Sequence, residues 1–240
     1  MKITSMIKLA LPLLLTSLFG SCVIYHPHNV DIPLLREKGE VDVDANFSLS
    51  APLLGAPAFN GTVSFAPLNN VGVQAAVCLS NTNSFYVQGA AGGFLPMGDN
   101  AVLEGYAGYG FGTSVHKTEV SEDNSYRKVE GNYNLVFGQV NTGWVNLLGG
   151  IFDIGLGFKG GLMMPNFEKS LVQGNGEVVK ETKLTDSHVL LQPQFMVRVG
   201  WQQVKFSFNV GYAYLSNWHD TYGYFNYEPI SVGLGVHFDF

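Results

Sequence analysis

Apolar and polar residues alternate with a period of two through most of the chain after Glu40. The last eleven residues, "ISVGLGVHFDF", show the pattern clearly, because every even-numbered residue from Ile230 to Phe240 is apolar and every odd-numbered one is small or polar. Successive side chains of a β-strand point to opposite faces, so this period indicates strands. We therefore expect an all-β fold.

Ten segments carry this alternation, separated by connections of unequal length. They lie near 41–49, 59–65, 71–79, 84–95, 101–115, 131–144, 150–163, 188–201, 204–215 and 228–240. The connections after the second, fourth, sixth and eighth segments are short, whereas those after the fifth, seventh and ninth are long and polar. Outer-membrane barrels share this asymmetry: they have tight periplasmic turns, long extracellular loops, an even strand number and both termini in the periplasm.

The apolar face of such strands can meet either a protein core or lipid, and alternation alone does not distinguish the two. Three features favour lipid. The chain has no second set of elements to cover ten apolar faces, the segments reach the roughly 9 to 11 residues that a tilted crossing needs, and the last residue is aromatic. We predict one antiparallel up-and-down transmembrane β-barrel over residues 40–240, of about ten strands and closed between the first and last, which leaves no backbone group unpaired in lipid.

Several stretches resemble a known superfamily. "SFAPLNNVGVQ", "EGYAGYGFG" and "GWQQVKFSFNVGYAY" look like the small outer-membrane β-barrel proteins of Gram-negative bacteria, the OmpA-like and porin-like barrels, particularly members with a lipoprotein-type leader. The resemblance spans about residues 22–240 and implies a fold and a location, but no catalytic residues. Phe238 and Phe240 resemble the terminal signal that the outer-membrane assembly machinery reads, so that machinery and outer-membrane lipids are the implied partners.

The N-terminus has the pattern of a secretion leader. Lys2 and Lys8 both precede the apolar stretch "LALPLLLTSLF", which is too short to span a bilayer as a helix. Gly20 and Ser21 before Cys22 resemble the lipobox of bacterial lipoproteins, in which the cysteine is diacylated. We predict a signal peptide over 1–21 and a lipidated N-terminus and tether over 22–39, on the periplasmic side. The alternative is a plain signal peptide cut nearby, with Cys22 an ordinary thiol.

The tether carries His26 and His28 around Pro27. Two imidazoles without a third ligand make a weak metal site, so we expect a solvated linker, no metal and no cofactor. The predicted lumen face instead carries charges of both signs: Asp42, Asp44, Glu104, Asp153, Lys159, Arg198, Lys205, His237 and Asp239. Buried charges are tolerated when they are paired and hydrogen-bonded, so these residues predict an interior charge network. A narrow solute path is the alternative, because a ten-strand lumen is much narrower than that of a sixteen-strand porin.

Enzymatic candidates near the predicted extracellular rim are few. They are His116, Ser187 beside His188, and His219 beside Asp220. Neighbouring residues of a strand point to opposite faces, which is poor geometry for a catalytic dyad. The stretch "GLGFKG", from Gly155 to Gly160, matches a dinucleotide-binding pattern, but strand alternation continues through it where that chemistry needs a turn and a helix. We predict no enzyme and no catalytic residue.

The long connections are the expected place for function. In "KSLVQGNGEVVKETK", Asn175 and Gly176 suit a tight turn, so the seventh and eighth strands are expected to continue as a ribbon beyond the membrane. The connection after the ninth strand concentrates aromatic side chains: Trp218, Tyr222, Tyr224, Phe225 and Tyr227. They suit an interfacial girdle or a surface that binds a sugar or a protein.

Composition narrows the function classes. The net charge is −6 and only 13% of residues are charged, with no basic run that could neutralise nucleic-acid phosphates. We predict an outer-membrane barrel lipoprotein with a structural or surface-interaction role, in adhesion or partner binding, through its long loops. The alternative is a lipid-anchored soluble barrel, similar to lipocalins, that binds an apolar ligand inside. A barrel enzyme or narrow channel is the third possibility.

Overall fold

The computed structural model describes residues 23–25, 28–51, 57–80, 83–119, 125–173, 176–201, 203–216, 226–227 and 229–240. The strands are β1 (Val23–Tyr25), β2 (Val41–Ala51), β3 (Pro57–Leu68), β4 (Val71–Ser80), β5 (Ser84–Met97), β6 (Ala101–Glu119), β7 (Tyr126–Asn146), β8 (Phe152–Val172), β9 (Val178–Leu184), β10 (His188–Gly200), β11 (Val204–Tyr212), β12 (Tyr214–Leu215), β13 (Asn226–Tyr227) and β14 (Ile230–Asp239). A four-residue turn, α2 (Leu147–Gly150), with positive φ at Leu148 and Gly149, joins β7 to β8. Among the described residues, no helix is long and apolar enough to cross a membrane.

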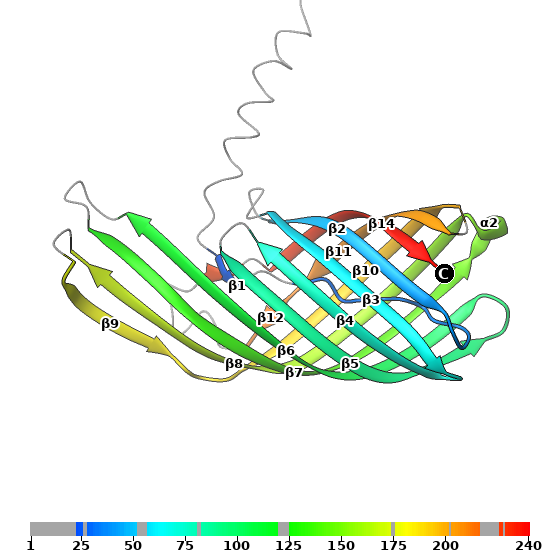
Figure 1. The fold of residues 1–240 in the computed structure, drawn as a ribbon, viewed down its shortest axis with the longest axis horizontal. Helices are drawn as coiled ribbons and strands as arrows, with labels where there is room; N and C mark the ends of the chain where they lie inside the picture. Colours follow the sequence, from blue (N-terminus) through cyan, green and yellow to red (C-terminus); the bar gives the residue numbers. More distant parts are fainter. Residues whose placement is uncertain are drawn as a thin grey trace, which may run out of the picture.

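The strands close into one antiparallel barrel. Neighbouring strands pair in chain order from β2 to β8, β8 then pairs with β10, and the order continues through β11 and β14. The last strand, β14, pairs with β2 along its length, from Ile230 opposite Ala51 to Asp239 opposite Asp42. The predicted barrel, closed between its first and last strands, is therefore confirmed (Figure 1).

Strands on one side of the barrel are longer than the sequence pattern suggests. β6, β7 and β8 pair far beyond the ends of their neighbours, and β9 pairs with the far part of β8. The residues 115–119, 126–131, 166–172 and 178–184 of these four strands form what we call the sheet extension, at the end opposite α2 and the C-terminus (Figure 1). Strand alternation is weak here because both faces of a sheet outside the membrane meet water. The predicted ribbon beyond the seventh and eighth strands is present, and the fifth and sixth strands extend in the same way.

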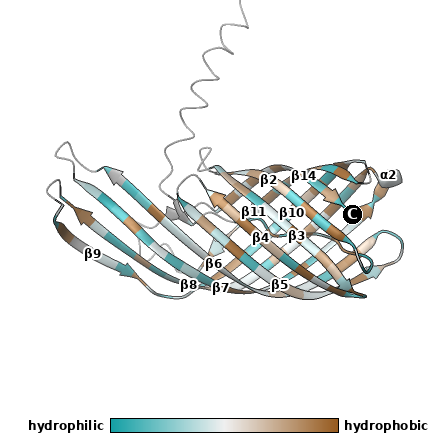
Figure 2. Ribbon diagram, in the orientation of Figure 1, coloured by the Kyte–Doolittle hydropathy of each residue, from teal (hydrophilic) through white to brown (hydrophobic). Residues whose placement is uncertain are grey.

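The outer wall of the ring is apolar and exposed. Phe47, Phe158 and Leu234 are 51%, 47% and 66% exposed, while the residues that alternate with them along the strands are mostly buried. Hydrophobic and hydrophilic residues alternate along the ribbons of the ring (Figure 2). Among the described outward-facing positions of the ring strands, charged side chains such as Lys117 occur only in the sheet extension. An exposed apolar wall without charges is stable in lipid and not in water. The alternative of a soluble barrel with an apolar interior is therefore wrong.

Pro193 interrupts the ladder between neighbouring strands. β10 pairs with β11 through Gln194 to Gly200 and resumes with β12 at Leu191. Proline has no backbone N–H to donate, and the break between β11 and β12 lies opposite it. Ala213, at that break, instead donates its N–H to the carbonyl of Pro229 at 2.6 Å. The stretch "GLGFKG" lies within β8, as the alternation predicts.

We predict that an arginine on the ring wall is costly and that the same change on the sheet extension is not. Val140 and Val179 are 54% and 52% exposed, so exposure does not separate them. Val140→Arg places a charge in the lipid-facing belt, which costs about 2–4 kcal/mol near the membrane midplane. Val179→Arg should change stability by less than about 0.5 kcal/mol, as other surface substitutions do. Urea unfolding in lipid vesicles measures both, and equal effects would contradict the assigned lipid belt.

Candidate functional site

The lumen of the barrel is filled by the chain's own N-terminal segment. Val30, Ile32, Leu34 and Leu35 are at most 2% exposed, and the segment runs inside the ring before it turns into β2 (Figure 1). We call residues 28–35 the plug. The predicted solvated tether over this part of 22–39 is therefore wrong, because the segment is buried against the wall on all sides.

The plug runs the length of the lumen from one mouth to the other. At the mouth on the same side as the sheet extension, Val23 and Tyr25 of β1 pair in parallel with Asn226 and Tyr227 of β13. At the end of the short turns, the Gly39 N–H donates to the carbonyl of Ala66 at 2.8 Å. Eight residues reach at most about 28 Å, which is enough to cross the ~25 Å apolar band of such barrels. The described chain thus begins at the mouth opposite its C-terminus, and residues 1–22, to which the expected periplasmic anchor belongs, lie outside the described residues.

Side-chain amides of the wall bind the backbone of the plug. Gln194 accepts from the Val30 N–H and donates to the Val30 carbonyl, both at 2.8 Å. The carbonyl of Asp31 accepts from Gln139 at 2.5 Å and from Asn141 at 3.0 Å. Gln192 donates to the carbonyl of His28. An isolated extended segment has no neighbouring strand, so these amides supply the partners that a sheet would otherwise provide.

Two charged wall residues also bind the plug. Arg198 donates to the carbonyls of Ile32 at 3.0 Å and Pro33 at 3.4 Å, and its Nη1 lies 3.4 Å from an Asp42 carboxylate oxygen. Glu104 accepts from the Leu35 N–H at 2.8 Å. These two contacts hold the part of the plug nearest the short turns.

The remaining charged residues named from the sequence form contacts within the lumen. Lys205 donates to both oxygens of Asp153, at 2.8 and 2.7 Å. Lys159 donates to Gln88 at 2.9 Å. The other contacts are the Asp44 carboxylate accepting from Asn46 at 2.8 Å, and His237 Nδ1 lying 3.4 Å from Asp42. Asp239 is half-buried opposite Asp42. The structure thus places all nine residues on the inner face, eight of them buried.

Glycines of the wall make room for the apolar side chains of the plug. A Cβ at Gly157 would lie 2.9 Å from Val30 Cγ1, and one at Gly155 would lie 3.0 Å from Ile32 Cγ2. A Cβ at Gly143 would lie 2.7 Å from Leu34 Cδ1. Real Cβ atoms rarely or never approach so closely, so a larger residue at these positions would require the plug or the neighbouring wall to shift. The wall therefore fits this particular segment in shape as well as in hydrogen bonding.

An aromatic cluster surrounds the plug at the mouth nearest the sheet extension. The His28 ring stacks on Tyr86 with ring centroids 3.6 Å apart, and its Nε2 lies 2.6 Å from the Tyr133 hydroxyl. Tyr25 meets both His28 and Tyr133 edge to face. His28 is thus a buried packing residue, which corrects the expectation that it is solvated; His26 lies outside the described residues.

A tight turn joins the plug to β2 at the opposite mouth. Glu40 accepts from the Arg36 N–H at 2.5 Å and the Glu37 N–H at 3.1 Å. Burial raises the pKa of the Glu40 carboxyl, and the two N–H donors partly oppose this rise. Gly39 has φ +94°, a conformation that favours glycine. This turn lets the chain reverse from the lumen into the wall.

The enzymatic candidates do not form a site in the described part of the chain. Ser187 is exposed, whereas His188 is buried and its Nδ1 lies 2.8 Å from the Ser216 carbonyl. His116 is half-buried in the sheet extension, where burial lowers its pKa, and His219 and Asp220 fall outside the description. No group of three or more His, Cys, Asp or Glu side chains that could hold a metal occurs among the described residues.

Several sequence predictions concern residues that the structure describes partly or not at all. Cys22 and the aromatic residues Trp218, Tyr222, Tyr224 and Phe225 lie outside the described residues, and only the backbone of Tyr227 is described, in β13. Phe238, near the end of the closing strand β14, and Phe240, just after it, stack with ring centroids 6.4 Å apart. Their proposed reading by the assembly machinery stays a prediction.

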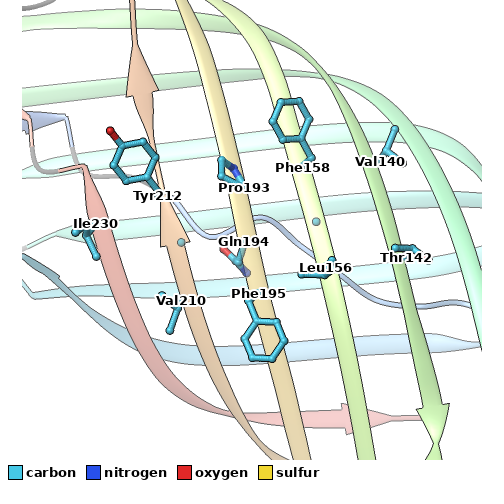
Figure 3. A pocket seen from close by; sticks show the side chains of 12 residues that line it. Val140, Thr142, Leu156, Phe158, Pro193, Gln194, Phe195, Val210, Tyr212 and Ile230 are labelled. Atoms are coloured by element: carbon cyan, nitrogen blue, oxygen red, sulfur yellow. The ribbon is translucent and has the colours of Figure 1, made fainter.

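A shallow apolar groove lies on the outer wall near Pro193. It has a volume of about 640 Å³ and is lined by Leu156, Phe158 and Phe195 among others (Figure 3). Its polar neighbours are engaged with protein: Gln194 binds Val30, and Thr142 donates to the Val102 carbonyl at 3.1 Å. The groove is therefore part of the lipid-facing surface and separate from the lumen.

The sequence contains a signal for the plug, although a solvated tether was expected here. Apolar residues recur at Val30, Ile32 and Leu34 between Asn29, Asp31 and Pro33. That alternation is too apolar for a solvated linker. The glycines on the inner face of β8, where a packed lumen would otherwise need larger side chains, pointed the same way.

Comparison with known proteins identifies the fold. Neither a family model nor a curated protein matches the chain. The outer-membrane protease OmpT from Escherichia coli is similar in structure with a TM-score of 0.60 and 10% identity, over 84% of this chain and 94% of OmpT. The translocator domain of the autotransporter NalP from Neisseria meningitidis has a TM-score of 0.43 and 12% identity, over 83% and 87%. The N-terminal barrel domain of Pseudomonas aeruginosa OprF has a TM-score of 0.37 and 11% identity, over 85% and 98%.

The likeness to OmpT bears on architecture alone. At 10% identity the OmpT likeness shows a shared fold. The closed ring, the apolar exterior and this likeness together make the chain a β-barrel protein of the outer-membrane type.

We predict that replacing Gln194 loosens the plug and that replacing Gln74 does not. Both side chains are 4% exposed on the inner face. Gln194→Met leaves two buried peptide groups of Val30 without partners, at about 1–3 kcal/mol each, and should lower the free energy of unfolding by about 2–4 kcal/mol. Neither polar atom of Gln74 has a hydrogen-bond partner among the described residues, so Gln74→Met should be neutral or stabilising. Urea unfolding in vesicles compares them; equal losses would count against specific binding of the plug.

Proposed function

We propose that this protein is a non-enzymatic outer-membrane barrel lipoprotein with a structural or surface-interaction role at the cell surface. The observation that carries the proposal is the filled lumen. At the level of Asp31, Asp44 and Arg198, the plug and the wall leave a cavity of only about 10 Å³ between them, no more than the room that one water molecule occupies. A plug that fits the wall this closely among the described residues supports a barrel that does not conduct solutes.

The sheet extension is the part that remains available for binding. In the described residues, 178–184 of β9 pair only with β8, and 116–119 of β6 pair only with β7. Its surface carries charges, including the pairs Lys128–Glu130 at 2.6 Å and Lys183–Glu168 at 3.9 Å. A sheet with open edges and a charged surface suits recognition of an extracellular protein or glycan, including addition of a partner's strand.

The proposal places the short turns in the periplasm and the sheet extension outside, as is usual for outer-membrane barrels. Outer-membrane lipids then surround the apolar wall, and the assembly machinery reads Phe238 and Phe240. The buried His188, held by a main-chain carbonyl, supports a role without catalysis. The protease activity of OmpT belongs to that protein, and among the described candidates no pairing of Ser187, His188 and His116 favours it here.

The test compares the full chain with a chain whose sheet extension is shortened. Residues 117–128 and 170–181 are each replaced by Asn-Gly, which joins the opposed pairs His116–Val129 and Lys169–Thr182 by two-residue turns. Cells that express either chain are tested for adhesion to immobilised glycans and extracellular-matrix proteins. We expect adhesion by the full chain and a loss of at least about tenfold on shortening, since more than 1.4 kcal/mol of contacts would be removed.

Two readouts make the result interpretable. A band that changes mobility on boiling should be retained by both chains, which shows that the ring is intact. Purified full chain in planar bilayers should show no steady ion conductance. Steady conductance by the full chain, or equal adhesion by the two chains, would contradict the proposed role.

A further inference from the structure

We infer that the N-terminal end of the mature chain emerges on the outer surface of the membrane, so that whatever is attached at Cys22 is displayed outside the cell. The inference rests on the proposed orientation of the barrel. It goes beyond it by assigning the chain's own N-terminus, rather than a loop, to the exterior, and it reverses the periplasmic anchor expected from the sequence.

The direction of the plug is fixed by contacts spaced along the lumen. His28 meets Tyr133, in the part of β7 that approaches the sheet extension. Further along, Asp31 accepts from the Ser64 hydroxyl at 2.6 Å, and Leu35 donates to Glu104, which lies three residues from the start of β6 at the short-turn mouth. Each contact involves a buried polar group, so a reversed plug would break all of them.

The contacts at the outer mouth hold the start of the described chain in place. Tyr25 is 1% exposed and packs edge to face on Tyr133, with ring centroids 5.6 Å apart. Val23 pairs in parallel with Asn226 of β13. This strand lies just before Pro229 and the start of β14 at Ile230. The chain therefore passes this mouth in a defined position.

Covalent reach completes the argument. Consecutive Cα atoms are 3.8 Å apart, so Cys22 lies within that distance of Val23. The opposite mouth lies beyond residues 28–35, which reach at most about 28 Å and already occupy the lumen. Cys22 therefore cannot return to the periplasmic side through the barrel. Acyl chains on Cys22, as the leader sequence predicts, would enter the outer leaflet of the outer membrane.

The rim of the barrel gives such an anchor access to lipid. On the side formed by β2 to β5, the strands end at Ala51, Ser80 and their neighbours, whereas β6 to β9 continue beyond them (Figure 1). A chain that leaves the mouth over this side, where the strands are shorter, meets the membrane surface directly.

An epitope tag tests the inference in the full-length protein. A short hydrophilic epitope is inserted between Cys22 and Val23, and intact and permeabilised cells are labelled with antibody. The same epitope between Gly98 and Asp99, in the turn between β5 and β6, marks the short-turn end, and one between Gly174 and Asn175 marks the end of the sheet extension. We expect the N-terminal and the 174–175 tags to be labelled on intact cells, and the 98–99 tag only after permeabilisation.

The outcomes separate this inference from the proposed function. An N-terminal tag hidden on intact cells while the 174–175 tag is labelled overturns the inference alone. If the 174–175 tag is also hidden, the proposed orientation fails and the inference fails with it. Mobility change on boiling confirms that each tagged chain is folded. For a tagged chain that does not fold, Ile24→Cys in a Cys78→Ser background, labelled with a membrane-impermeant maleimide, gives the same readout with a smaller change.

Discussion

The structure depends on one requirement: the backbone of an extended segment enclosed in a barrel must find hydrogen-bond partners without a neighbouring strand. Each unpaired peptide group in such a place costs about 1–3 kcal/mol. The wall meets this requirement with side chains, chiefly Gln139 and Asn141 of β7 and Gln194 and Arg198 of β10. The polar lumen face is therefore built to hold one peptide, and its glycines fit that peptide's aliphatic side chains.

The buried charges follow from the same arrangement. Arg198 lies between the carboxylate of Asp42 and the plug carbonyls of Ile32 and Pro33, so one guanidinium connects the closing strands to the plug. Buried ion pairs contribute little net stability by themselves, because desolvation offsets their attraction. Removing one partner is costly, however, so such groups fix the arrangement of the strands and the position of the plug more than they increase stability. The network is thus consistent with a filled lumen that keeps one conformation.

The barrel could be predicted from the sequence because lipid imposes a simple rule on every strand. Alternation from Val41 onward, the short turns and the terminal Phe240 all follow from outward apolar faces, and they sufficed for strand order and closure. The inner positions of Arg198 and Lys205 followed from the same period. The sheet extension was harder to predict, because water on both faces removes the alternation beyond Val115. The plug could not be placed from period alone, since its partners, such as Gln194 and Glu104, are distant in sequence and specified by three-dimensional fit.

The most direct test of a lumen filled by its own N-terminal segment is a disulfide between plug and wall. Val30 Cγ1 lies 2.9 Å from the Cβ position of Gly157, which suits a disulfide. In full-length protein with Cys78→Ser, the pair Val30→Cys and Gly157→Cys should form a linked peptide, identified by mass spectrometry of oxidised outer membranes. Val30→Cys with Gly160→Cys, whose added Cβ would meet Phe158 and Leu191 on the outer wall, should not. The account predicts a linked peptide in the Val30→Cys/Gly157→Cys pair and none in the Val30→Cys/Gly160→Cys pair. Free thiols in both pairs would contradict the plugged lumen.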